Sequence, residues 1–117
     1  MNNLKVRLST PSVNNLELAK IKGIFKNSWL GYGPNVGKFE KAWSSYFGVN
    51  YSIALNSCTA ALHLSLAVNN FKKNKKVLVS AMTFSASAAS VLYCGLEPVF
   101  VDINPKTLVM SFEDLKK

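Results

Sequence analysis

The residues best placed to do chemistry form a short polar run, Asn56-Ser57-Cys58-Thr59. The apolar stretch of residues 51–56 predicts a strand before it, and the helix-forming residues 60–68 predict a helix after it. A helix start exposes unpaired backbone N–H groups and the positive end of the helix dipole, so it can bind an anion. The amides of Cys58 and Thr59 and the Thr59 hydroxyl could therefore hold a phosphate. Equally, Ser57 or Thr59 could serve only as the N-cap.

A second candidate is Phe84, which follows the apolar strand predicted at residues 77–79. Ligands of open parallel sheets bind beyond the carboxyl ends of the strands, and we expect Phe84 and the turn at residues 57–59 to share that edge. An aromatic ring beside a phosphate site could stack on a flat cofactor. For a single phenylalanine considered alone, a place in the core is more common.

Other polar residues give weaker signals. His63 stands in an apolar stretch and is expected as an ordinary core or surface histidine, and the absence of a GxSxG motif argues against Ser57 as a hydrolase nucleophile. Asp102, at the end of a strand predicted over residues 97–102, is expected to cap a turn. Glu17 and Glu40 are expected on solvated helix faces. No phosphate-binding GxxxxGK[ST] or GxGxxG motif occurs.

Composition excludes several classes of protein. The chain has 117 residues, of which 49% are hydrophobic and 17% charged, which is typical of a folded domain and not of a disordered tail. No apolar run is long enough to span a membrane. The net charge of +8 comes from 13 Lys and one Arg against six acids, and this dispersed lysine surface favours no nucleic-acid partner. Cys58 and Cys94 lack metal-ligand spacing, so we expect no metal site and two buried free thiols in a reduced, cytoplasmic protein.

The elements that would position these residues alternate between helix and strand. Helical periodicity predicts helices over residues 15–26 and 36–47, the second ended by Gly48 as a left-handed cap. Strands at residues 51–56, 77–79 and 97–102, separated by helices, predict a βαβαβ order and a parallel α/β sheet. A capping-box pattern starting at Ser111 opens a last helix just before Lys117. Three strands with open edges lead us to expect an N-terminal fragment of a longer protein.

Several motifs in this order resemble the DegT/DnrJ/StrS sugar aminotransferases, which are pyridoxal-phosphate (PLP) enzymes of fold type I. The matching residues, over about 16–115, are Trp29-Leu30, Gly33-Pro34, Phe39-Glu40, Asn56-Ser57-Cys58-Thr59-Ala60-Ala61-Leu62-His63, Thr83-Phe84, Gly95 and Pro98-Val99-Phe100-Val101-Asp102. The resemblance implies a three-layer αβα fold. Residues 1–117 would form a single incomplete domain, with N-terminal helices in residues 1–48 and the βαβαβ part of the PLP-binding large domain in residues 49–117.

The resemblance also implies roles for the candidate site residues. Ser57, Cys58 and Thr59 would bind the cofactor phosphate, with Cys58 where the family often has Gly, and Phe84 would stack on the pyridine ring. The Schiff-base lysine and the aspartate that holds the pyridine nitrogen lie downstream in the family, so we assign no catalytic residue. Without that lysine the chain is expected to be inactive as written.

The expected partners follow from the same family. They are a nucleotide-linked keto sugar, an amino donor such as glutamate and a second copy in a homodimer, in a pathway of sugar or cell-surface polysaccharide synthesis. Relatives with histidine in place of the lysine act as sugar dehydratases, and nothing in this sequence separates the two activities. The chain could instead be a non-catalytic remnant or split half that binds a complementary chain, or a small basic phosphate- or nucleic-acid-binding module. An isolated fragment is expected to be marginally stable or to aggregate.

Overall fold

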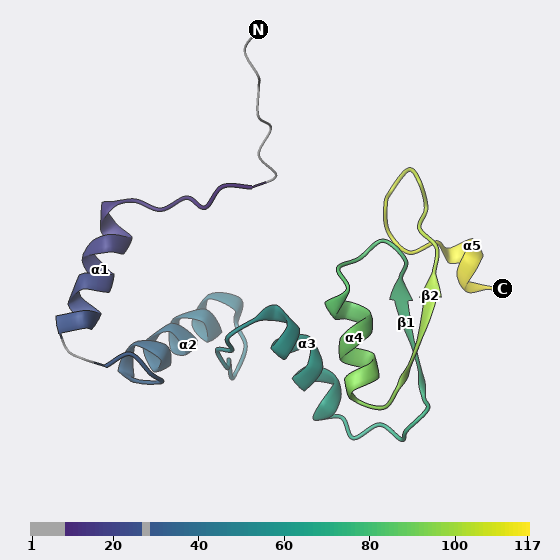
Figure 1. The fold of residues 1–117 in the computed structure, drawn as a ribbon, viewed down its shortest axis with the longest axis horizontal. Helices are drawn as coiled ribbons and strands as arrows, with labels where there is room; N and C mark the ends of the chain where they lie inside the picture. Colours follow the sequence, from purple (N-terminus) through teal and green to yellow (C-terminus); the bar gives the residue numbers. More distant parts are fainter. Residues whose placement is uncertain (1–8, 27–28) are drawn as a thin grey trace, which may run out of the picture. The chain divides into compact units, whose positions relative to one another are not determined.

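The structure, a computed structural model, describes residues 9–26 and 29–117 and contains helices and a small parallel sheet (Figure 1). In chain order the elements are α1 (Asn15–Lys26), α2 (Pro34–Phe47), α3 (Cys58–Ala67), β1 (Lys76–Ser80), α4 (Ala86–Tyr93), β2 (Glu97–Val101) and α5 (Phe112–Leu115). The chain divides into two compact units, one ending at Ala54 and the other covering Leu55–Lys117.

In the first unit, a capping box starts α1. The Asn14 side chain accepts a hydrogen bond from the Leu16 amide at 2.8 Å, and the Glu17 carboxylate accepts one from the Asn14 amide at 2.7 Å. The sequence prediction of a helix over residues 15–26 is confirmed. Glu17 is exposed, as its sequence position predicts, and its carboxylate also caps the helix.

Helix α2 begins and ends as its sequence dictates. Pro34 occupies the first turn, where a missing N–H costs nothing, and Gly48 ends the helix with φ +66°. This confirms the predicted left-handed cap. Phe39, Trp43 and Phe47 stack in a row along the helix, with ring centroids 5.6 and 4.7 Å apart.

The second unit contains the sheet. Strands β1 and β2 pair in parallel, in a register that runs from Lys76 opposite Glu97 to Ser80 opposite Val101. Helix α4 connects the two strands and packs on them, and α3 lies beside α4 and runs in the same direction, opposite to the strands (Figure 1). The buried cluster consists of Val79, Val91 and Leu96. The predicted parallel α/β arrangement is therefore confirmed for this unit.

The strand predicted at residues 51–56 is not formed, and that prediction is wrong. The segment joins no strand in the described part of the chain, and the sheet there has two strands and not three. The amide of Ala54 instead donates to the Glu40 carboxylate at 2.8 Å. Apolar character favours a strand, but a strand forms only when a neighbour supplies its ladder of hydrogen bonds.

Most apolar side chains of the described residues are exposed. Five are buried, namely Val79, Ala86, Val91, Leu96 and Val101, whereas large ones such as Trp43 and Phe84 are about half exposed or more. Helix α3 is apolar on nearly every side and buries none of its residues. Helices of this kind normally lie inside a protein, so the second unit presents surface that other structure would cover. Between residues 9–26 and 29–117 no helix combines the length and apolarity needed to cross a membrane.

Candidate functional site

The turn before α3 is built around Ser57. This residue has extended backbone angles, and its hydroxyl accepts a hydrogen bond from the Ala60 amide at 3.1 Å. Its carbonyl oxygen accepts a bond from the Ala61 amide at 3.2 Å. Of the two residues that the sequence offers as N-cap, the structure selects Ser57, which leaves the Thr59 hydroxyl available for another role.

Two backbone N–H donors of this turn have no hydrogen-bond acceptor among the described residues. Among the residues that the structure describes, the amides of Cys58 and Thr59 donate to no protein acceptor, and neither does the Thr59 hydroxyl. They are the first N–H groups of α3, which have no partner within a helix. Three donors at the positive end of a ten-residue helix are the chemistry that a phosphate requires. The turn therefore fits a phosphate group such as that of PLP.

Cys58 differs from its sequence prediction. The expectation of a buried thiol is wrong, because Cys58 is the first residue of α3, ahead of the helical turns that pack against α4, and is exposed. Cys94 fits the prediction better, since it is partly buried and its thiol contacts the carbonyl oxygen of His63 at 3.7 Å. The His63 ring packs edge-on against Tyr93, with centroids 5.6 Å apart, as an ordinary partly buried histidine does.

Phe84 lies in the loop between β1 and α4 and is 78% exposed. Phe84 therefore does not take the core position that is more common for a phenylalanine considered alone. Its carbonyl oxygen accepts a hydrogen bond from the Ser87 amide at 3.0 Å, and the hydroxyls of Thr83 and Ser87 are 2.9 Å apart, so the loop is tied to the start of α4. These contacts fix the backbone of Phe84 while leaving its ring free.

The structure brings the two candidate groups to the same end of the second unit. Helices α3 and α4 run opposite to β1 and β2, so the start of α3 and the loop with Phe84 both lie at the carboxyl ends of the strands (Figure 1). This is the edge where open parallel sheets bind ligands. Cofactor binding by Ser57, Cys58, Thr59 and Phe84 stays a prediction.

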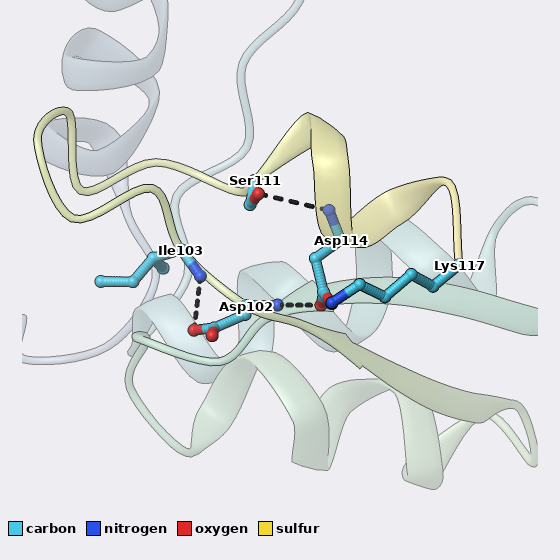
Figure 2. A network of polar contacts seen from close by, with 5 residues as sticks. All are labelled: Asp102, Ile103, Ser111, Asp114 and Lys117. Carbon is cyan, nitrogen blue, oxygen red and sulfur yellow. Dashed lines mark hydrogen bonds and ion pairs between the residues drawn. The ribbon is translucent and has the colours of Figure 1, made fainter.

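A polar network closes the loop that follows β2 at the same end of the sheet (Figure 2). The Asp114 carboxylate accepts a hydrogen bond from the Asp102 amide at 2.8 Å and pairs with Lys117 at 3.0 Å. These contacts, that of the Asp102 amide above all, lower the pKa of Asp114. The Asp102 carboxylate accepts from the Ile103 amide at 2.7 Å, which is the turn role expected of it. Ser111 caps α5 through the Asp114 amide at 3.3 Å, but the Asp114 side chain does not complete the predicted capping box.

Glu40 is the polar residue whose role the sequence pattern does not reveal. The expectation of a solvated side chain is wrong, since Glu40 is partly buried and binds both the Ala54 amide and the Tyr32 hydroxyl, the latter at 3.0 Å. The hydrogen bond to this carboxylate, and its charge, raise the pKa of Tyr32 above its usual value. The Trp29 indole N–H donates to the Tyr32 carbonyl oxygen at 2.9 Å, so one carboxylate organises the turn before α2 and the segment after it. A lone glutamate among aromatic residues is the signal that could have suggested this role.

Comparison with known proteins shows the class of protein to which the chain belongs. The fold matches the N-terminal part of fold type I PLP-dependent transferases, among them Spr1654 of Streptococcus pneumoniae, which is named a sugar aminotransferase and has structures in PLP and PMP forms. That match has 32% identity and a TM-score of 0.86, and it covers 95% of this chain and 28% of the other. Residues 11–117 match the DegT/DnrJ/EryC1/StrS aminotransferase family. The chain belongs to this family, as its motifs predicted.

The names of individual relatives describe two kinds of activity. GDP-perosamine synthase of Caulobacter vibrioides is 36% identical, over 96% of this chain and 30% of its own length. GDP-4-keto-6-deoxy-D-mannose-3-dehydratase of E. coli is 26% identical with a TM-score of 0.84, over 93% of this chain and 30% of that protein. The chain thus spans less than a third of the length of these relatives.

Proposed function

We propose that this chain supplies the phosphate-binding and ring-stacking parts of a PLP-dependent aminotransferase that acts on nucleotide-linked keto sugars. The observation that carries the proposal is the group of three unpaired donors at the start of α3, the amides of Cys58 and Thr59 and the Thr59 hydroxyl. Membership in the aminotransferase family and similarity to a protein named for a GDP-linked amino sugar support the substrate class.

The residues of the site have different parts in this proposal, and Ser57 contributes by capping α3 and so holding the turn. The two amides bind phosphate oxygens through the backbone, which is why a cysteine in place of the family's usual glycine is compatible with the site. The exposed ring of Phe84 covers one face of the cofactor ring. When bound, PLP supplies an electron sink for transfer of the amino group. The lysine that would hold PLP covalently belongs to a part of the family fold that this chain does not span, so the chain alone is proposed to be inactive.

The wider setting is proposed on the same basis. The complete enzyme would use an amino donor such as glutamate, act as a cytoplasmic homodimer and serve sugar or polysaccharide synthesis. A sugar dehydratase is the second candidate, favoured by the structural similarity to the E. coli dehydratase. The residue at the Schiff-base position of the complete protein distinguishes the two activities: lysine for an aminotransferase and histidine for a dehydratase.

A binding experiment tests the site directly. The probe is pyridoxamine 5′-phosphate (PMP), because its amine cannot form adventitious Schiff bases with the 13 lysines of the chain. We expect PMP to bind, by fluorescence titration or calorimetry, more tightly than pyridoxamine, which lacks the phosphate. Thr59→Val removes one hydroxyl donor to a charged group, worth about 1.5–3 kcal/mol, so it should weaken PMP binding about tenfold to a hundredfold.

The matched control is Thr107→Val, which removes an exposed threonine hydroxyl in the loop after β2. Equal binding of PMP and pyridoxamine, or equal loss in both variants, would contradict the proposed site.

The intact mass of the protein made by its own cells is a separate measurement. A mass well above 12.9 kDa points to a longer product in which the downstream lysine can be sought, and a mass of 12.9 kDa supports a split half or remnant.

A further inference from the structure

The loop between α3 and β1 carries a cluster of positive charge. Its members, which we call the basic cluster, are the exposed lysines Lys72, Lys73, Lys75 and Lys76. Among the residues that the structure describes, these lysines form no ion pair. Glu97 lies opposite Lys76 in the register of the sheet, but the two side chains do not pair. The basic cluster is therefore not neutralised by the described part of the chain, and its charges repel one another.

The backbone that carries the basic cluster is held in place. The Asn69 side chain donates to the Ser65 carbonyl oxygen at 2.7 Å, and the Asn74 amide donates to the Gly95 carbonyl oxygen at 3.0 Å. Asn70 and Asn74 are in the left-handed region, with φ +49° and +63°, which asparagine tolerates better than most residues. Binding to this loop would therefore require little further ordering of its backbone.

A pocket of about 230 Å³ adjoins the basic cluster. It lies where the last turns of α3 meet the end of α4 and the turn before β2, and its walls include Leu66, Phe71, Tyr93 and Leu96. The stem of Lys73 runs along Gly95, whose two chain neighbours both line the pocket, and its Cγ is 3.7 Å from the position that a Cβ would take there. The basic cluster and the pocket thus belong to one surface.

This surface lies at the opposite end of the second unit from the candidate cofactor site. Helices α3 and α4 run against the strands, so both helices end at the amino ends of β1 and β2 (Figure 1). A partner bound at this end would leave the turn at residues 57–59 and the loop with Phe84 uncovered.

We propose that the basic cluster and the adjoining pocket bind an acidic segment of a partner protein, with one large apolar side chain of that segment in the pocket. Four lysines along one loop complement an extended run of aspartate or glutamate residues. Small-molecule sites usually have about 300–1,000 Å³, so the smaller pocket here is suited to a single anchoring side chain.

Two other anionic partners fit this surface less well. The loop has lysines but no arginine, whose planar fork is the side chain best matched to phosphates and guanine edges, and this disfavours a nucleic acid. The apolar side chains line a hollow, whereas binding to a membrane surface uses an apolar face that enters the lipid.

The test measures binding of a fluorescein-labelled peptide, in which one phenylalanine precedes a run of glutamates, to the 117-residue chain by fluorescence anisotropy. A second peptide has alanine in place of the phenylalanine and should bind about tenfold more weakly or worse, because it leaves the pocket empty. Added salt should weaken the binding of both peptides. This comparison uses only the wild-type chain, so it does not depend on the folding of any variant.

Charge reversal locates the site on the protein. Lys72→Glu combined with Lys75→Glu should weaken binding of the phenylalanine peptide about tenfold or more. The matched control combines Lys106→Glu with Lys116→Glu, which makes the same change of net charge at exposed lysines that follow β2, and it should change the affinity by less than about threefold. Circular dichroism checks that both double variants keep their helices.

Four results would overturn the proposal: no binding of the phenylalanine peptide, equal affinity for the two peptides, equal loss in the two double variants, or tighter binding of duplex DNA or phosphatidylserine vesicles in the same assay. The last result would make a nucleic acid or a membrane the partner. Because the assay contains no PMP, failure of the proposed cofactor site would leave this outcome independent.

Discussion

Replacing Ser57 by aspartate separates the two roles that the turn before α3 could have. Aspartate is as good an N-cap as serine, so Ser57→Asp should keep the bond to the Ala60 amide and the stability of α3. Ser57→Ala should instead cost about 1 kcal/mol, because that amide loses its acceptor. If the amides of Cys58 and Thr59 hold a phosphate, the new carboxylate lies next to it.

The magnitude follows from Coulomb's law. A carboxylate about 4 Å from a doubly charged phosphate costs about 2 kcal/mol even at the dielectric constant of water, which is about a thirtyfold loss of affinity. PMP titration of Ser57→Asp measures this loss, and thermal unfolding followed by circular dichroism checks the helix. Asn70→Asp is the matched control, since it adds the same charge beyond the far end of α3 at a residue with φ +49°, which aspartate tolerates. Unchanged PMP affinity in Ser57→Asp would refute the assignment of the phosphate to this turn.

Three further predictions concern stability. Val91→Ala should lower the free energy of unfolding by about 2 kcal/mol in a denaturant titration, because it deletes buried methyl groups, whereas Leu92→Ala, on the exposed side of α4, should change it by less than about 0.5 kcal/mol. Gly48→Ala should cost about 1 kcal/mol in the same titration, since alanine is strained at φ +66°. The contacts of Asp114 hold the pKa of its carboxylate below the value in the unfolded chain. Its contribution to the free energy of unfolding is therefore complete above the unfolded pKa and is lost as the pH falls through the lowered pKa of the folded chain. Hydrogen exchange of the Asp102 amide should accelerate over that pH range, and Asp114→Asn should remove this pH dependence.

Local sequence was enough to predict the helices. Helix α1 follows from its apolar spacing, and the end of α2 follows from Gly48, because both signals lie within a few residues of the structure they determine. The N-cap could be narrowed to Ser57 or Thr59 for the same reason. Phe84 could be placed on the right edge of the sheet, but not on the surface, since exposure depends on what packs above the loop.

Structure that depends on distant partners could not be predicted in this way. Residues 51–56 have the composition of a strand, but a strand requires a neighbour that composition does not identify. The bonds from Glu40 to Ala54 and from Asp114 to Asp102 join residues 14 and 12 positions apart, and neither has a local pattern. Cys58 illustrates the same limit, since its apolar neighbours suggested burial and its place at the first residue of α3 exposes it.

On the outer edge of β2, Pro98 has no N–H and the Asp102 amide is already bound to the Asp114 carboxylate, so this edge is largely closed. The outer edge of β1 is open, since its outward amides donate to no acceptor in the described part of the chain. This difference has a consequence for how free copies of the chain could mispair. Fibres grow by edge-to-edge addition when every sheet offers two open edges, because each added copy presents a new one. A sheet with one open edge can pair with a second copy through β1 and then has only the closed edges of β2 left outside. Pro98 and Asp114 would thus limit mispairing through strands to two copies, an isologous dimer instead of an open-ended assembly.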